Sequence, residues 1–191
     1  MKKLIFVFAI ASLFAFQSSG QKFRFGLKGG LNLPSADAYN FDPSDEATGW
    51  HAGLFASIRI AKFGIQPELQ YSYVQFSNDN AELDYAWGAV PVMLKYYIIK
   101  GLNVQVGPQF SYLITSDFES GGNTQDNTDL LKDTDVSIGI GAGFELPFGL
   151  DVHARYLIGV TDIADDPTIG EINTSTFQVS VGLALIKLGL L

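Results

Sequence analysis

Asp151, His153 and Arg155 are the residues of this chain whose types and spacing come closest to a catalytic cluster. Residues two apart in a β-strand share a face, so a carboxylate, an imidazole and a guanidinium would project together. A carboxylate can orient an imidazole, and the imidazole can then act as the base that activates a serine hydroxyl. Serine hydroxyls are available on the same side of neighbouring stretches, at Ser57, Ser72 and Ser111. A nucleophile needs its base within hydrogen-bond reach, which this pattern does not establish, so polar filling of an interior is the interpretation we favour.

A second group of residues suggests metal chemistry. Asp126, Asp129, Asp133 and Asp135 offer oxygen ligands of the kind that Ca²⁺ prefers. The stretch lacks the regular ligand spacing and the turn glycine of an EF-hand loop. We therefore expect a solvated acidic loop, and we predict no catalytic residue, no metal site and no cofactor.

The elements that must position these residues are β-strands. Eight stretches alternate apolar and polar residues with a period of two, and away from the stretch ends every charge lies on the same side of the alternation. The connections between them alternate long and short, as in a membrane barrel with short periplasmic turns and longer outer loops. The predicted strands cover residues 22–33, 48–60, 65–76, 84–98, 102–114, 135–146, 150–161 and 174–187.

The apolar side of each stretch is predicted to face lipid. A lysine or arginine there would cost about 2–4 kcal/mol at the bilayer midplane. The later stretches show the pattern clearly, and their predicted lipid-facing residues include Trp50, Leu54, Ile58, Leu69, Tyr71, Tyr73, Val90, Val92, Leu94, Tyr96, Val104, Val106, Phe110, Tyr112, Ile138, Ile140, Phe144, Val152, Tyr156, Ile158, Phe177, Val179, Val181 and Leu183.

The opposite side carries the charges and is predicted to form an interior polar network. An unpaired charge is costly to bury, so the acidic and basic side chains of this network should form ion pairs. We therefore predict that the network stabilises the fold and has no catalytic role. The predicted network consists of Arg24, Lys28, His51, Arg59, Glu68, Lys95, Glu145, Asp151, His153 and Arg155.

The fold class that follows is all-β: an eight-stranded antiparallel up-and-down transmembrane β-barrel with a polar interior filled by side chains. The alternative is a soluble barrel that binds a ligand with its apolar side inward. Small residues favour the membrane barrel, because glycines gather on the polar side, where a crowded interior explains them better than a solvated surface does. They are Gly26, Gly30, Gly53, Gly107, Gly139, Gly141, Gly143, Gly159 and Gly182. Pro67, Pro91 and Pro108 conflict with the strand assignments, because proline lacks a ladder donor.

The first twenty residues have the pattern of a secretory signal peptide, with Lys2 and Lys3, an apolar core from Leu4 to Phe16, and small residues before Gln21. We predict a cleaved signal peptide over residues 1–20 and one barrel domain over residues 21–191. The chain has no cysteine, so disulfides are excluded. Its formal charge of −8 becomes −10 once Lys2 and Lys3 are removed, which argues against a nucleic-acid partner.

Across the mature chain, several segments resemble the PorT-like family of outer-membrane β-barrel proteins of Gram-negative bacteria. The segments are Gly26–Asn32, Ile65–Tyr71, Val90–Tyr97, Val106–Phe110, Gly139–Glu145 and Ala154–Gly159. The resemblance implies export, insertion by the barrel-assembly machinery and residence in the outer membrane, with a link to secretion of surface proteins in some relatives. It brings no catalytic motif.

Function is then expected to be non-enzymatic. Apart from Glu68, Glu145 and Asp151, the acidic residues lie in the four longer connections or at the strand ends beside them. We expect a structural or interaction platform whose acidic outer loops meet a protein partner, or divalent cations that bridge to outer-membrane lipid. The alternatives are a membrane-embedded hydrolase or acyltransferase that uses His153 and Asp151, and a small-solute channel.

Overall fold

The regular elements of the computed structural model are all β-strands. It describes residues 21–34, 46–77, 81–120, 123–126, 134–160 and 175–190. Within this part of the chain, no helix is long and apolar enough to cross a membrane. The strands are β1 (Gln21–Pro34), β2 (Glu46–Ile60), β3 (Phe63–Ser77), β4 (Ala81–Tyr97), β5 (Leu102–Ser120), β6 (Asn123–Asp126), β7 (Thr134–Glu145), β8 (Leu150–Gly159) and β9 (Ser175–Leu190).

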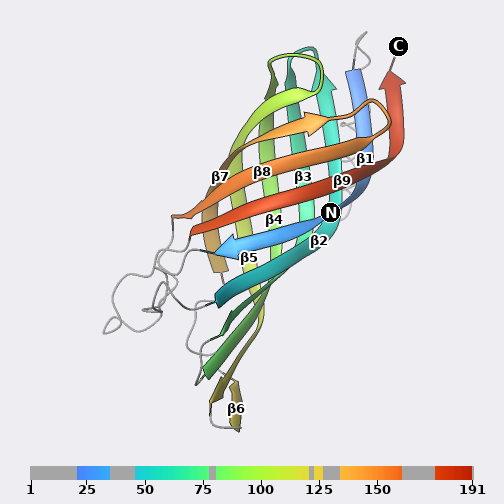
Figure 1. Cartoon of the computed structure of the whole chain (residues 1–191). Coiled ribbons are helices and arrows are strands. Elements are labelled where there is room, and N and C mark those ends of the chain that lie inside the picture. The colour runs from blue at the N-terminus through green and yellow to red at the C-terminus, as the bar shows by residue number, and fades with distance from the viewer. Residues whose placement is uncertain are drawn as a thin grey trace, which may run out of the picture.

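The sheet closes into an eight-stranded antiparallel barrel, which confirms the predicted fold class. Strands adjacent in the chain pair with each other, β5 pairs with β7, and β1 pairs with β9 to complete the wall. The remaining strand, β6, pairs with the end of β5. Figure 1 shows the wall strands lying obliquely, with the short turns at one end and β6 beyond the other.

The strand ends lie within three residues of the predicted ones, with one exception. The prediction of a loop from residue 115 was wrong, because β5 continues to Ser120 and pairs with β4 as far as Ala81. We call this part of β3, β4 and β5, from residues 74–77, 81–87 and 113–120, together with β6, the outer extension. The sequence of this extension is too polar for lipid-facing strands, which is why a loop was predicted. Strands that pair outside the membrane need no apolar face, so the alternation rule does not detect them.

The two faces of the wall are those that the alternation predicts. Each predicted lipid-facing residue is exposed or half-buried, and neighbouring side chains alternate sharply: Leu69 is 59% exposed but Glu68 4%, and Val106 is 48% exposed but Gln105 2%. A soluble barrel would bury the apolar side. The soluble alternative is therefore wrong.

The strand prolines occupy places where the ladder is interrupted on one side. Pro67 is paired with β4 and not with β2, and Pro91 is paired with β5 and not with β3. Pro108 is likewise paired with β7 and not with β4. The register is the same before and after each interruption, so no bulge is needed. The missing proline donor accounts for the gap on one side of each strand, and the pairing on the other side continues through it.

Two of the short turns depend on glycine. Gly101 and Gly149 have φ angles of 81° and 103°, a region that L side chains rarely adopt. The Gly149 carbonyl accepts a bond from Arg24 Nη2 at 3.1 Å, so this turn is tied to the barrel interior.

Candidate functional site

The structure places the predicted polar network inside the barrel. Glu145 lies near the short-turn end with its side chain 10% exposed. Arg59 is half-buried at the same end, where its guanidinium stacks 3.7 Å over the Tyr97 ring. The other members are 8% exposed or less: Arg24, Lys28, His51, Glu68, Lys95, Asp151, His153 and Arg155.

Glu68 is the hub of a central cluster. Arg155 donates through both terminal nitrogens, with Nη1 2.9 Å from Glu68 Oε2 and Nη2 bonded to Oε1. Lys28 Nζ lies 3.1 and 3.2 Å from the two carboxylate oxygens. Gln66 and Gln70 donate to Oε1 and Oε2 at 2.7 and 2.5 Å. Two buried cations therefore share this one carboxylate.

A second cluster lies toward the short turns. Arg24 spans two carboxylates, with its terminal nitrogens 3.0 Å from Glu145 and 2.5 Å from Asp151. Lys95 Nζ and the Tyr97 hydroxyl donate to Glu145 at 3.0 and 2.7 Å. Together the two clusters fill much of the lumen with paired charges, as expected for a barrel of eight strands.

The predicted pair of Asp151 and His153 does not form a catalytic arrangement. His153 Nε2 lies 4.0 Å from Asp151 Oδ2, and Asp151 binds Arg24 instead. Because Gln105 turns its Oε1 toward Arg155, its amide nitrogen donates to His153 Nδ1 at 3.1 Å. Both histidine nitrogens thus point to groups other than a serine. Ser72 and Ser111 bond to Asn32 and Gln109.

A different trio has the bonding pattern of a nucleophilic triad. His51 Nε2 lies 2.9 Å from Ser180 Oγ, and His51 Nδ1 lies 2.8 Å from Asn32 Oδ1. All three side chains are 1% exposed, so substrate has no access to Ser180 in this arrangement. The sequence placed His51 inward but did not reveal this trio, because β1, β2 and β9 meet only through barrel closure.

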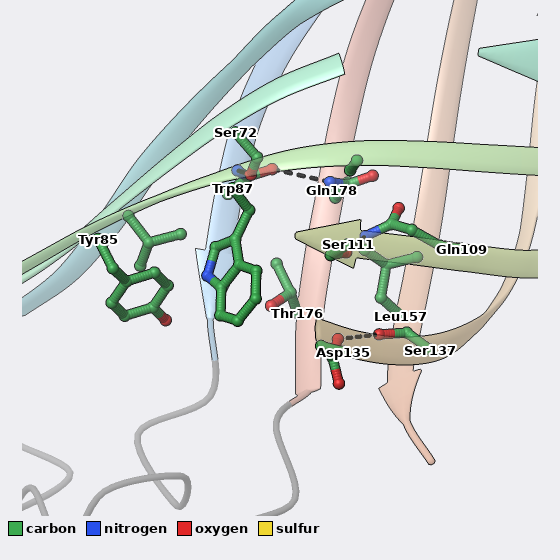
Figure 2. Close-up of a pocket in the computed structure, with 13 residues that line it drawn as sticks. Ser72, Tyr85, Trp87, Gln109, Ser111, Asp135, Ser137, Leu157, Thr176 and Gln178 are labelled. Carbon is green, nitrogen blue, oxygen red and sulfur yellow. Dashed lines mark hydrogen bonds between the residues drawn. The ribbon is translucent and has the colours of Figure 1, made fainter. Parts of the chain in front are cut away.

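A small cavity opens at the outer mouth, above this trio. Its volume is about 60 Å³, and neither His51 nor Ser180 lines it. Figure 2 shows Tyr85 and Trp87 on one side and Gln109, Ser111, Asp135 and Ser137 on the other. These residues come from β4, β5 and β7, and among them only Ser111 and Asp135 were candidates from the sequence. Tyr85 and Trp87 follow the same alternation as the inward-facing Lys95, and the extra residue of the bulge beside them, Ile114, belongs to β5.

Of the four aspartates considered for calcium, Asp135 is the one whose side chain the structure describes. It is buried, and its Oδ2 accepts a bond from Ser137 Oγ at 2.8 Å. Asp129 and Asp133 lie outside the described residues, and Asp126 belongs to β6. Among the described residues, no group of three or more His, Cys, Asp or Glu side chains is placed to hold a metal ion.

A closed barrel with an apolar outer surface and a charged, filled lumen is a membrane-spanning β-barrel. The chain matches the family model described as "Outer membrane protein beta-barrel domain" over residues 5–184, and it belongs to that family. The protein is therefore an outer-membrane barrel. A comparison with curated proteins gave no match.

The similar solved structures have low sequence identity to this chain. Neisserial surface protein A is 12% identical, with a TM-score of 0.52, and the alignment covers 86% of this chain and 97% of that one. The attachment invasion locus protein Ail of Yersinia pestis is 13% identical, with a TM-score of 0.48 and coverage of 88% and 100%. The outer membrane protein OprG of Pseudomonas aeruginosa is also 13% identical, with a TM-score of 0.38 and coverage of 88% and 95%.

Proposed function

We propose that this protein is a non-enzymatic barrel that serves as an interaction platform at the cell surface. The observation that carries this proposal is the division of the molecule into a filled wall and an outer extension. The pairing of β5 with β7 ends at Tyr112–Thr134, whereas β4 and β5 remain paired to Ala81–Ser120. Binding surfaces are commonly carried on such projections from a rigid scaffold.

The register of the outer extension favours a cationic partner. Asp117 lies opposite Asp84 on one side and Asp126 on the other, and Glu82 lies opposite Glu119. Like charges directly opposite each other destabilise a sheet, so an external cation would offset a real cost. We propose a basic protein surface, or divalent cations that bridge to outer-membrane lipid, as the partner. The net charge of −8 disfavours a nucleic acid.

Planar bilayers and hydrolysis assays test the proposal against its two alternatives. The purified, refolded barrel should give no discrete conductance steps and no hydrolysis of phospholipid or simple esters, because charged side chains fill the lumen and bury Ser180. Discrete steps would favour a small-solute channel. An activity that disappears in His153→Ala or Ser180→Ala would show a membrane-embedded hydrolase or acyltransferase.

The outer extension can be tested separately. Replacing residues 116–133 with a short glycine-serine linker removes the end of β5 and all of β6. The variant should still insert and keep a heat-dependent shift on a denaturing gel, since the wall pairing up to Tyr112 is intact. It should bind a heptalysine peptide more weakly than the full chain does. Equal binding would contradict a role for the extension.

We also propose a link to secretion or envelope assembly, supported by the PorT-like segments of the sequence. Insertion would then use the barrel-assembly machinery after cleavage of residues 1–20. Deleting the coding sequence in its source organism should lower the amount of secreted surface proteins or alter outer-membrane composition, measured by surface labelling and mass spectrometry. Unchanged profiles would contradict this link.

A further inference from the structure

The mouth cavity presents unpartnered hydrogen-bond acceptors. Asn32 Nδ2 donates to the Trp50 carbonyl at 3.2 Å, which fixes Asn32 Oδ1 as an acceptor. Gln178 Nε2 donates to that oxygen at 3.0 Å, so the orientation of the Gln178 amide is fixed too. Gln178 Oε1 is consequently a buried acceptor without a partner in a side chain that is 2% exposed. This residue lines the cavity.

A second acceptor and a negative charge accompany Gln178. Gln109 also lines the cavity, is 7% exposed and has an unpartnered Oε1. Among the lining residues, Asp135 is the one acid, and none is a lysine or arginine. Buried acceptors without donors are costly. The cavity therefore favours an occupant that donates hydrogen bonds and carries positive charge.

Aromatic rings line another side of the cavity. Tyr85 and Trp87 lie with ring centroids 6.3 Å apart and planes at 81°, so they form a corner. Both side chains are buried. The face of an aromatic ring attracts an ammonium or guanidinium group, and tryptophan does so best.

We infer that the mouth cavity is a binding site for an organic cation with N–H donors, of the alkylammonium class. The donors pair with Gln178 and Gln109, the charge faces Asp135, and the alkyl stem lies against Trp87. The volume of about 60 Å³ suits a terminal group of a few heavy atoms. The inference rests on the proposed platform function, because it identifies what the outer mouth of that platform binds.

Trp87 provides the reporter for the test. The chain has two tryptophans, so Trp50→Phe leaves Trp87 as the remaining one, inside the cavity. The refolded Trp50→Phe barrel in detergent is titrated with n-butylammonium chloride at constant ionic strength. The fluorescence of Trp87 should change saturably. Sodium chloride and neutral n-pentanol, in parallel titrations, should give no saturable change.

Matched variants assign the effect to the cavity. Asp135→Asn removes the charge but keeps an oxygen for Ser137, and it should weaken binding about tenfold. Glu46→Gln removes an equal charge at the start of β2, outside both the cavity lining and the outer extension, and it should change binding little. Gln109→Glu adds a charge beside the ligand and should strengthen binding, a gain that misfolding cannot produce. Each variant is first checked for the heat-dependent gel shift.

The outcomes separate the site from the platform function. No saturable response to n-butylammonium, an equal response to n-pentanol, or equal weakening by Asp135→Asn and Glu46→Gln would overturn the cation site. None of these results bears on conductance or hydrolysis, which test the platform function itself. Comparing putrescine with a blocked Gly-Lys-Gly peptide then distinguishes two sources of the same group: tighter binding of the peptide assigns a protein side chain, and tighter binding of putrescine assigns a free amine.

Discussion

At the scale of single residues, Glu68 holds the interior together. Lys28 and Arg155 are both buried and both use this carboxylate as their partner. Breaking a buried ion pair by removing one member leaves an uncompensated charge, which is more destabilising than replacing the whole set. If the network stabilises the barrel, removing the Glu68 charge should therefore lower the free energy of unfolding by a predictable amount.

Glu68→Gln should lower the free energy of unfolding by about 3–5 kcal/mol, because two buried cations lose their counter-charge. Urea titration of the refolded barrel, followed by tryptophan fluorescence and by the gel shift, measures the change. Leu69→Met is the control at the adjacent lipid-facing position and should cost less than about 1.5 kcal/mol. Similar unfolding midpoints for the two variants would show that the cluster contributes little.

At the scale of elements, the strands approach one another so closely that some positions admit only glycine. A Cβ on Gly53 would lie 2.8 Å from the Gln70 Cα and against the Leu69 carbonyl, and this backbone cannot move aside. A Cβ on Gly88, in contrast, would make its nearest contact at 3.6 Å with the end of Ile114. The glycines of the polar side thus serve strand packing as well as the crowded lumen.

Gly53→Ala should consequently destabilise the barrel by about 1–3 kcal/mol through overpacking. Gly88→Ala should stabilise it by about 0.4–1 kcal/mol, because alanine restricts the unfolded chain and fits the folded one. Both values come from urea unfolding under identical detergent conditions. A loss of stability in Gly88→Ala as large as that in Gly53→Ala would mean that strand glycines matter for another reason.

At the scale of the whole molecule, the apolar outer surface fixes how the barrel sits in the membrane. Val106 lies in the paired part of the wall and is 48% exposed, whereas Val160 follows β8 at the outer end and is 57% exposed. The two valines have similar exposure and differ in their depth along the barrel. They make a matched pair for a test of membrane placement.

Val106→Arg should destabilise the inserted barrel by about 2–4 kcal/mol, and Val160→Arg by about 0–1 kcal/mol, because the cost of a lipid-facing arginine falls toward the interface. Folding into liposomes at a series of urea concentrations, read by the gel shift, measures both. Equal costs at the two positions would contradict the proposed placement of the bilayer.

The alternation of residue types along the chain is enough to predict the barrel, its eight wall strands and the face on which almost every wall residue lies. These properties follow from a local rule, because lipid on one side and a crowded interior on the other impose a period of two on each strand separately. The polar members of the network were predictable for the same reason. The end of β5 was not, since outside the bilayer the rule no longer applies.

Which interior residues contact each other follows only from the folded barrel. Glu68 and Arg155 are 87 residues apart, and His51 and Ser180 are 129 apart. Their contacts depend on closure and on the register of every ladder between them. The same holds for the mouth cavity, because side chains from seven different strands line it together. The face on which a side chain lies is set within one strand, whereas the contacts between interior side chains are set by the closed sheet.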